Sequence, residues 1–239
     1  MSNLAQVRAL SKGRVTLGIR MTDRPGWRQL SELLDLGPWP PIDLEMDFDQ
    51  YVLACVLSRA LEEIDAGEAT ATEATGLSQV ELRDILNHSF PAPTIHVFRL
   101  EEVSDPEPGP EEELLRGLLL AHARAGDSAS VRFAKIIARR ALRHDHLWKE
   151  LGLFDRVELS RLLATHFPTL AAGNTKNMRW KKYFYRKLCE AEGFSLCTAP
   201  SCQECKELES CFGPEEGESA STVGQVGGDL ELKCRPCRL

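Results

Sequence analysis

Residues 48–64 read FDQYVLACVLSRALEEI and predict a long amphipathic helix. Apolar side chains recur there every three or four positions, which places them on one face of a helix. Asp47 precedes the run and gives it the acidic start that is typical of a helix N-terminus. We expect this helix to end near Ile64 and to bury a wide stripe, formed by Phe48, Val52, Leu53, Cys55, Val56, Leu57, Ala60 and Leu61.

Helical patterns continue on the C-terminal side of this stretch. Ser78 and Glu81 form a capping-box signature, and Pro91 ends the helix that follows. Only Thr94–Phe98 alternates like a strand, and that stretch is short and isolated. The sequence therefore predicts an all-α core. Its further helices are expected at 111–123, after Asp127 (Val131, Ala134, Ile137, Ala138 and Leu142 on one face), after a second capping box at Asp155 and Glu158 (with Val157, Leu159, Leu162 and Leu163), and from near Asn174 to before Gly193.

The chain divides into three parts by composition. Residues 1–46 lack a sustained period and are expected to be a loosely ordered N-terminal extension. Residues 47–213 form the single helical domain, which ends in a cysteine-rich loop, and the Gly-rich residues 214–239 are expected to be a flexible tail. Within the domain, the acidic, Pro-rich residues 101–110 predict a hinge or a surface loop.

Charge and hydropathy narrow the class of protein. The 239 residues carry a formal net charge of -7, which is unlike a general binder of nucleic acids or anionic membranes. No apolar signal region follows the N-terminal charges, and no stretch approaches the roughly 20 apolar residues that span a bilayer. We therefore expect a cytoplasmic protein with no nucleic-acid and no membrane partner. In a reducing cytoplasm, clustered cysteines indicate metal or redox chemistry more than disulfides.

Four cysteines lie close together in residues 197–211, which read CTAPSCQECKELESC. The spacing is C-x4-C-x2-C-x5-C. Thiolates are soft ligands that suit iron–sulfur clusters and zinc, and a short loop lets several of them face one centre. The sequence therefore predicts a metal centre, whose ligands are Cys197, Cys202, Cys205 and Cys211.

The identity of the metal has alternatives. A structural zinc site usually takes two close cysteine pairs on either side of a longer loop, whereas these ligands follow one another along a short segment as in bacterial ferredoxins. Spacing therefore favours iron–sulfur over zinc. The first two intervals also match plant-type ferredoxins, with Cys234 as a distant fourth ligand, but those proteins need a β-rich fold and Cys211 is nearer.

The remaining cysteines carry weaker signals. Cys234 and Cys237 form a lone C-x2-C pair beside two arginines, and they are either reactive thiols or incidental residues of a flexible end. Cys55 lies in the apolar stripe of the first helix and is expected to pack in the core. Cys189 lies near the cysteine loop, and its role stays open.

A basic, aromatic helix leads into the cysteine loop. Trp180, Phe184 and Leu188 share one stripe, which is expected to pack in the core, while a second stripe carries Arg179, Lys182 and Arg186. The basic stripe is either a solvated face or a docking surface. Its position beside a thiolate cluster favours docking, because an anionic cluster or an oxoanion is stabilised by cations.

Two histidines flank Asp145 just before the motif Leu147-Trp148. His144 and His146 can reach one metal together only if the turn there is not helical, so they carry little weight as ligands.

These residues resemble the NifQ family. The resemblance covers most of the chain, from about Phe48, and the cysteine spacing is that family's signature. The motifs that carry it are His146-Leu-Trp, Leu151-Gly-Leu-Phe-Asp-Arg, Leu163-Ala-Thr-His-Phe-Pro168, Asn174-Thr-Lys-Asn-Met-Arg-Trp-Lys-Lys, and Cys189 to Gly213.

The resemblance implies a carrier and not an enzyme, so no catalytic residues are assigned. It implies an iron–sulfur protein, with a 4Fe-4S type cluster or a Mo-Fe-S derivative, that supplies molybdenum for the iron–molybdenum cofactor of nitrogenase. The implied partners are the cofactor-assembly scaffold and the nitrogenase reductase. Two alternatives stay open: a one-electron iron–sulfur redox protein, and an interaction module stabilised by zinc.

Overall fold

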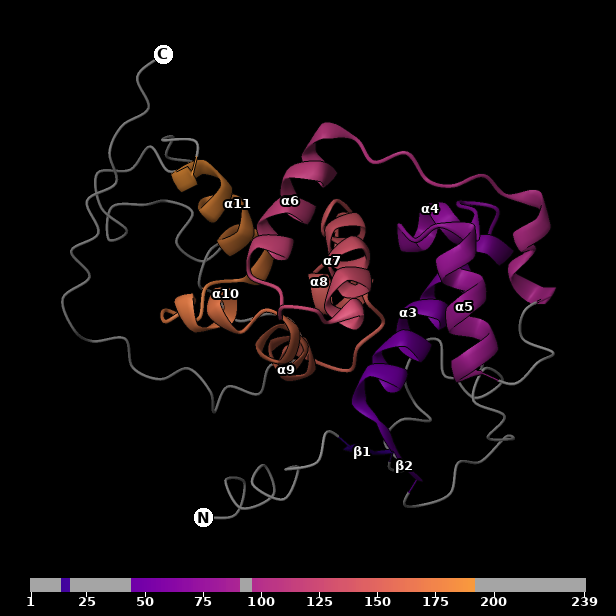
Figure 1. The fold of residues 1–239 in the computed structure, drawn as a ribbon, viewed down its shortest axis with the longest axis horizontal. Coiled ribbons are helices and arrows are strands. Elements are labelled where there is room, and N and C mark those ends of the chain that lie inside the picture. Colours follow the sequence, from indigo (N-terminus) through magenta and orange to yellow (C-terminus); the bar gives the residue numbers. More distant parts are fainter. Residues whose placement is uncertain (1–13, 18–43, 91–95, 192–239) are drawn as a thin grey trace.

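The computed structural model describes residues 14–17, 44–90 and 96–191, and this part of the chain is mostly helical (Figure 1). The prediction of a helical core is confirmed for these residues. A 3-10 turn, η3 (Leu100–Glu102), lies between the helices α5 and α6. The helices are α3 (Phe48–Asp65), α4 (Ala71–Thr75), α5 (Gln79–Ser89), α6 (Pro110–Ala121), α7 (Ser128–Ala141), α8 (Leu147–Glu150), α9 (Arg156–His166), α10 (Pro168–Gly173) and α11 (Trp180–Ala191).

A short antiparallel ribbon precedes α3. β1 (Arg14–Leu17) pairs with β2 (Leu44–Asp47), so that Arg14 lies opposite Asp47. The sequence pattern does not predict this ribbon, because strands of this length are too short to show an alternation. β2 continues directly into α3, so the ribbon marks where the chain enters the helical core. The remainder of the predicted N-terminal extension lies outside the described residues.

α3 is buried along most of its length, as its sequence predicts. Val52, Cys55 and Val56 are each at most 1% exposed. The carboxylate of Asp47 accepts the backbone N–H groups of Asp49 and Gln50 and so caps the helix. α3 contacts α4 and the ribbon. It therefore anchors the first half of the core.

The acidic connection before α6 is a surface segment that is tied to the core. In Figure 1 it runs along the upper edge of the molecule from η3 to α6. The Thr72 hydroxyl donates to the carbonyl oxygen of Ser104 at 2.7 Å, and the backbone N–H of Gln79 donates to the Asp105 carboxylate at 2.7 Å. Of the two predictions, these contacts favour a surface loop over a hinge. The predicted capping box of Ser78 and Glu81 is also present.

The buried faces of α7 and α9 differ from the predicted ones. Val131 and Val157 are 41% and 70% exposed, and Leu142 is 36% exposed, while the other residues predicted to be buried on these helices are in the core. α7 contacts α4, α6 and α9. Its buried face therefore includes Phe133 and Ile136 in place of Val131 and Leu142. Sequence periodicity gives the width of an apolar face but not which neighbours enclose it.

The second predicted capping box is only half formed. Asp155 accepts the backbone N–H of Glu158 at 2.9 Å, but the Glu158 carboxylate accepts from the backbone N–H of Phe154 and from the Tyr51 hydroxyl. The Tyr51 contact joins α9 to α3. The Glu158 carboxylate therefore binds these two groups and not the backbone N–H of Asp155, which a complete capping box would require.

α11 begins at Trp180, later than the predicted start near Asn174. The Asn174 side chain accepts from the backbone N–H of Met178 at 2.9 Å and donates to the carbonyl oxygen of Met178 at 2.8 Å. Asn177 has a positive φ of 52°. Residues 174–178 therefore form a turn, and the positive φ of Asn177 is incompatible with a helix that starts at Asn174.

None of the helices in the described ranges is long and apolar enough to cross a membrane.

Candidate metal centre and the basic face of α11

The four cysteines of the predicted centre, Cys197, Cys202, Cys205 and Cys211, lie outside the described residues, as do Cys234 and Cys237. The described structure ends at Ala191, the last residue of α11, shortly before Cys197. α11 is therefore the last described helix before the cysteine segment in the sequence.

α11 is fixed to the core by its aromatic side chains. Trp180, Tyr183 and Phe184 are at most 5% exposed, which confirms the core packing predicted for Trp180 and Phe184. The indole N–H of Trp180 donates to the Ser160 hydroxyl at 3.1 Å, and the Tyr183 hydroxyl donates to the carbonyl oxygen of Leu170 at 3.1 Å. Burial raises the pKa of the Tyr183 hydroxyl, so it stays a donor at neutral pH. The helix that precedes the cysteine segment is thus packed firmly on the core.

A third contact ties α11 to α6, which lies beside it in Figure 1. The Tyr185 hydroxyl donates to the Glu111 carboxylate at 2.6 Å. Burial and this hydrogen bond raise the pKa of the Tyr185 hydroxyl. Contacts with α6, α9 and α10 therefore fix α11 from three sides.

The charges of α11 are positive at its start and balanced near its end. No Asp or Glu occurs between Glu158 and Glu190 in the sequence. At the C-terminal end, Arg186 and Lys187 both bind the Glu190 carboxylate, each at 2.8 Å. Burial tends to raise the pKa of Glu190, but hydrogen bonds from Lys187 and Arg186 outweigh it and hold the pKa below its usual value. Among the side chains of α11 itself, the unbalanced positive charges are therefore those near its N-terminal end.

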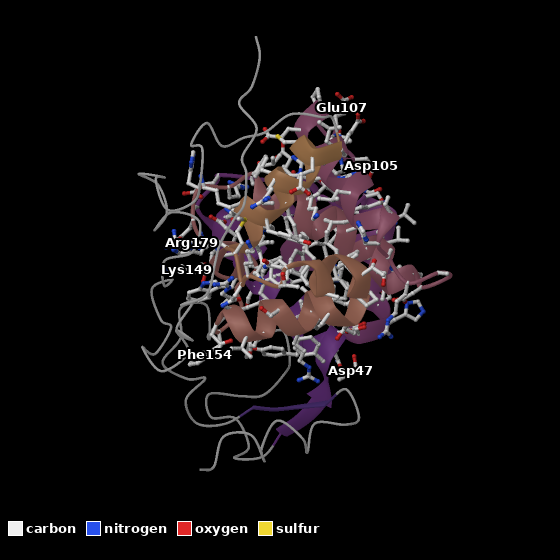
Figure 2. All side chains as sticks on the ribbon, turned by 90° about the vertical axis from the view of Figure 1, so that its left-hand side faces the viewer. Asp47, Asp105, Glu107, Lys149, Phe154 and Arg179 are labelled. Carbon is white, nitrogen blue, oxygen red and sulfur yellow. The ribbon has the colours of Figure 1, made fainter. Side chains whose placement is uncertain are left out.

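The predicted basic stripe accordingly divides into two parts. Arg186 is paired with Glu190. Lys182 is exposed, and no carboxylate of the described residues lies within ion-pair distance of it. Arg179 precedes the helix and lies at the edge of the molecule in Figure 2, at the same edge as Lys149. Arg179 and Lys182 line the same cavity, whereas Arg186 is paired with a carboxylate.

A cavity of about 220 Å³ opens at the start of α11, and we call it the α11 pocket. It lies between the first turn of that helix and the turn that joins α7 to α8. The Lys181 ammonium donates to the carbonyl oxygens of Arg143 and Asp145 and so ties this turn to α11. The pocket is lined by His144, Asp145, His146, Leu147, Leu159, Arg179, Trp180, Lys181 and Lys182.

The turn between α7 and α8 is not helical, so both histidines reach the same pocket. In the sequence these histidines carry little weight as metal ligands, and the signals for the pocket are the His-Asp-His triplet and the basic residues Arg179 and Lys182. Even so, nowhere in residues 44–90 and 96–191 do three His, Cys, Asp or Glu side chains gather closely enough to hold a metal ion. The described residues that line the pocket are mostly basic.

The structure describes two cysteines, Cys55 and Cys189. Cys55 is 1% exposed in the core, as predicted. Cys189 is half-buried in the last turns of α11. Cys55 is too enclosed to bind an external ligand.

Comparisons with known proteins point to one family. The family model described as NifQ matches residues 52–213, which contain all four cysteines of the predicted centre. A protein named "Protein NifQ homolog" from Sinorhizobium fredii is 92% identical over 96% of this chain and 100% of its own length. "Protein NifQ" of Rhodobacter capsulatus is 37% identical over 75% of this chain and 94% of its own, and "Protein NifQ" of Azotobacter vinelandii is 49% identical over 44% of this chain and 54% of its own. No solved structure matches the chain.

Proposed function

The chain belongs to the NifQ family of nitrogen-fixation proteins, and on that basis we propose that it is an iron–sulfur protein that carries molybdenum for the iron–molybdenum cofactor of nitrogenase. The observation that carries the proposal is the C-x4-C-x2-C-x5-C motif inside the matched region. The motif supplies four soft ligands, which suit iron, sulfide-bridged clusters and molybdenum held through sulfur.

The ligands of the proposed centre are Cys197, Cys202, Cys205 and Cys211. This donor set fits a 4Fe-4S type cluster or a Mo-Fe-S derivative, because each thiolate can supply one bond to a metal. The described residues supply no competing set of three metal ligands. Bound at the four thiols, the cluster would supply the sulfur-rich site in which molybdenum is carried as cargo. No catalytic role is assigned to any side chain.

The packed α11 supports this proposal by giving the cysteine segment a fixed origin. Its aromatic face is held on α9 and α10 by the hydrogen bonds of Trp180 and Tyr183. The basic side chains around its start attract anionic groups, whether an oxoanion or an acidic surface of a partner. We propose that the partners are the cofactor-assembly scaffold and the nitrogenase reductase, and that the protein acts in the cytoplasm.

A transfer experiment tests the proposal. The protein is purified without oxygen from cells supplied with molybdate, then mixed with the scaffold, the reductase and a source of reducing equivalents. The carrier function predicts that molybdenum leaves the protein and appears in the cofactor on the scaffold. If the protein instead exchanges electrons with the reductase and no molybdenum moves, it is a redox protein and the proposal is wrong.

A matched control separates delivery from leakage. The same protein is mixed with the reductase alone. The mixture is then passed through a filter that retains protein, and the molybdenum that passes the filter is measured over the same period. Delivery requires that molybdenum stays bound in this control and moves only when the scaffold is present. Equal loss in both mixtures contradicts specific delivery.

A further inference from the structure

The α11 pocket has the composition of an anion site. Three of its lining residues, Leu147, Leu159 and Trp180, are buried and at most 5% exposed. The other lining residues have nitrogen-bearing side chains, apart from one carboxylate, that of Asp145. The nitrogen-bearing residues are His144, His146, Arg179, Lys181 and Lys182.

We propose that the α11 pocket binds a tetrahedral oxoanion, and that for this carrier the oxoanion is molybdate before it reaches the cysteines. The inference rests on the proposed function for the identity of the anion, while the pocket itself is lined by described residues. Arg179 and Lys182 supply the charge that attracts the anion, and the two histidines supply ring N–H donors.

The single carboxylate of the pocket is already engaged. Asp145 accepts the backbone N–H of His146 at 2.7 Å, and the Lys149 ammonium lies 3.7 Å from the same carboxylate oxygen. The Asp145 charge is thereby offset from outside the pocket. Lys182, in contrast, has no ion-pair partner among the described residues. Among the residues that line the cavity, Arg179, Lys181 and Lys182 are cationic and Asp145 is anionic.

Lys181 holds the two walls of the pocket together. It donates to the carbonyl oxygens of Arg143 and Asp145 and so joins the turn after α7 to the first turn of α11. The bond between Trp180 and Ser160 also fixes the first turn of α11. Both walls are thus positioned before an anion arrives, which lowers the ordering cost of binding.

The size of the cavity suits a small hydrated anion. Its volume of about 220 Å³ exceeds several-fold the ~30 Å³ that a water molecule occupies in the liquid. An oxoanion of five heavy atoms fits with part of its hydration shell. A nucleic-acid backbone needs a continuous basic track, and the paired Arg186 and Lys187 interrupt such a track along α11.

The test compares two variants of the full chain, each with the same kind of charge removal. The double variant Arg179→Gln/Lys182→Gln removes the charges of the α11 pocket. The control, Lys187→Gln, removes a charge of the same helix that lies outside the pocket and is paired with Glu190. Molybdate binding to anaerobically purified protein is measured by equilibrium dialysis, with iron content and helical circular dichroism recorded for each sample.

We expect the double variant to bind molybdate at least about ten-fold more weakly than wild type, because each lost charged donor contributes roughly that factor. The control is expected to bind within about two-fold of wild type, and iron content is expected to be unchanged in both. Unchanged molybdate binding by a folded double variant overturns the proposal. So does an equal loss in the control, because it would show a general effect of net charge.

Two further arms identify the anion. Sulfate and phosphate are added as competitors at equal concentration, and weaker competition than by unlabelled molybdate supports molybdate as the natural occupant. Stronger competition by phosphate overturns that assignment.

The failures of the two proposals are distinguishable. If wild type delivers molybdenum while the double variant binds molybdate normally, the pocket proposal fails and the carrier function stands. If wild type delivers no molybdenum but loses molybdate binding on the double substitution, the carrier function fails and the pocket stands.

Discussion

The Glu63 carboxylate of α3 and the Arg140 guanidinium of α7 form an ion pair inside the core, 77 positions apart in the chain. Glu63 is 3% exposed and Arg140 is fully buried. Arg143 binds the other carboxylate oxygen at 3.0 Å. Burial lowers the pKa of Arg140, although Glu63 opposes the shift. The pair fixes how α7 lies against α3.

Breaking this pair is expected to destabilise the fold strongly. Glu63→Ala leaves a buried guanidinium without its partner, which costs about 3–5 kcal/mol. The measurement is urea unfolding followed by circular dichroism. The double variant Glu63→Met/Arg140→Met removes both charges and is expected to recover most of the loss. A double variant no more stable than Glu63→Ala would show that the charges are not the cause.

A substitution at Gly152 is expected to disturb the contact between α3 and the loop after α8. Gly152 has φ +68°, and a Cβ atom there would lie 2.6 Å from the carbonyl oxygen of Cys55. Gly152→Ala therefore adds a backbone clash to the usual left-handed cost of about 1–2 kcal/mol. Gly67→Ala is the matched control, because Gly67 has φ +69° with open space around it. Equal losses of unfolding free energy in the two variants would contradict the clash.

Acid is expected to weaken the start of α7 through Asp127. The hydrogen bond from Ser130 holds the pKa of the Asp127 carboxyl below its usual 3.8 against the opposing effect of burial, and the backbone N–H of Ala129 and the His166 ring assist. A lowered folded-state pKa contributes stability that is fully present above 3.8 and is lost as the pH falls through the lowered value.

The check is the difference in unfolding free energy between wild type and Asp127→Asn at a series of pH values. We expect this difference in unfolding free energy to shrink as the pH falls below 3.8 and through the lowered pKa. A difference that grows on acidification has the wrong sign for a lowered pKa and would exclude this account.

The local structure of the first half of the domain could be predicted from sequence. The apolar run of α3 and the Ser78 capping box both appear as expected, because each depends on residues a few positions apart. The Glu63–Arg140 pair could not be predicted, since nothing local links two charges so far apart in the chain. The exposure of Val157 likewise depends on where α9 meets its neighbours.

The candidate site divides in the same way. The cysteine motif and the basic helix can be predicted from the spacing of their residues. The assignment of the four cysteines as ligands depends on the sequence and the family only, because they lie outside the described residues. The α11 pocket is not readable from spacing, because it needs the turn after α7 to meet the first turn of α11 in space. Lys181, which makes that junction, looks in the sequence like any other lysine of a basic run.

Serine substitutions test the ligand assignment. Replacing Cys197, Cys202, Cys205 or Cys211 by Ser is expected to remove most of the iron, because a hydroxyl is a poor substitute for a thiolate. Cys55→Ala is the control, since that thiol is buried in the core and should leave iron content unchanged. Iron is measured per folded protein after anaerobic purification. Full iron content in all four serine variants would contradict the assignment.

The central claim is that this chain carries molybdenum on an iron–sulfur centre, and elemental analysis of the wild-type protein tests it most directly. The protein is purified without oxygen from cells supplied with molybdate, and iron, acid-labile sulfide, molybdenum and zinc are determined in the same sample. The account predicts iron and sulfide accompanied by molybdenum, without stoichiometric zinc. Stoichiometric zinc in a colourless protein, or iron and sulfide with no molybdenum, would contradict it.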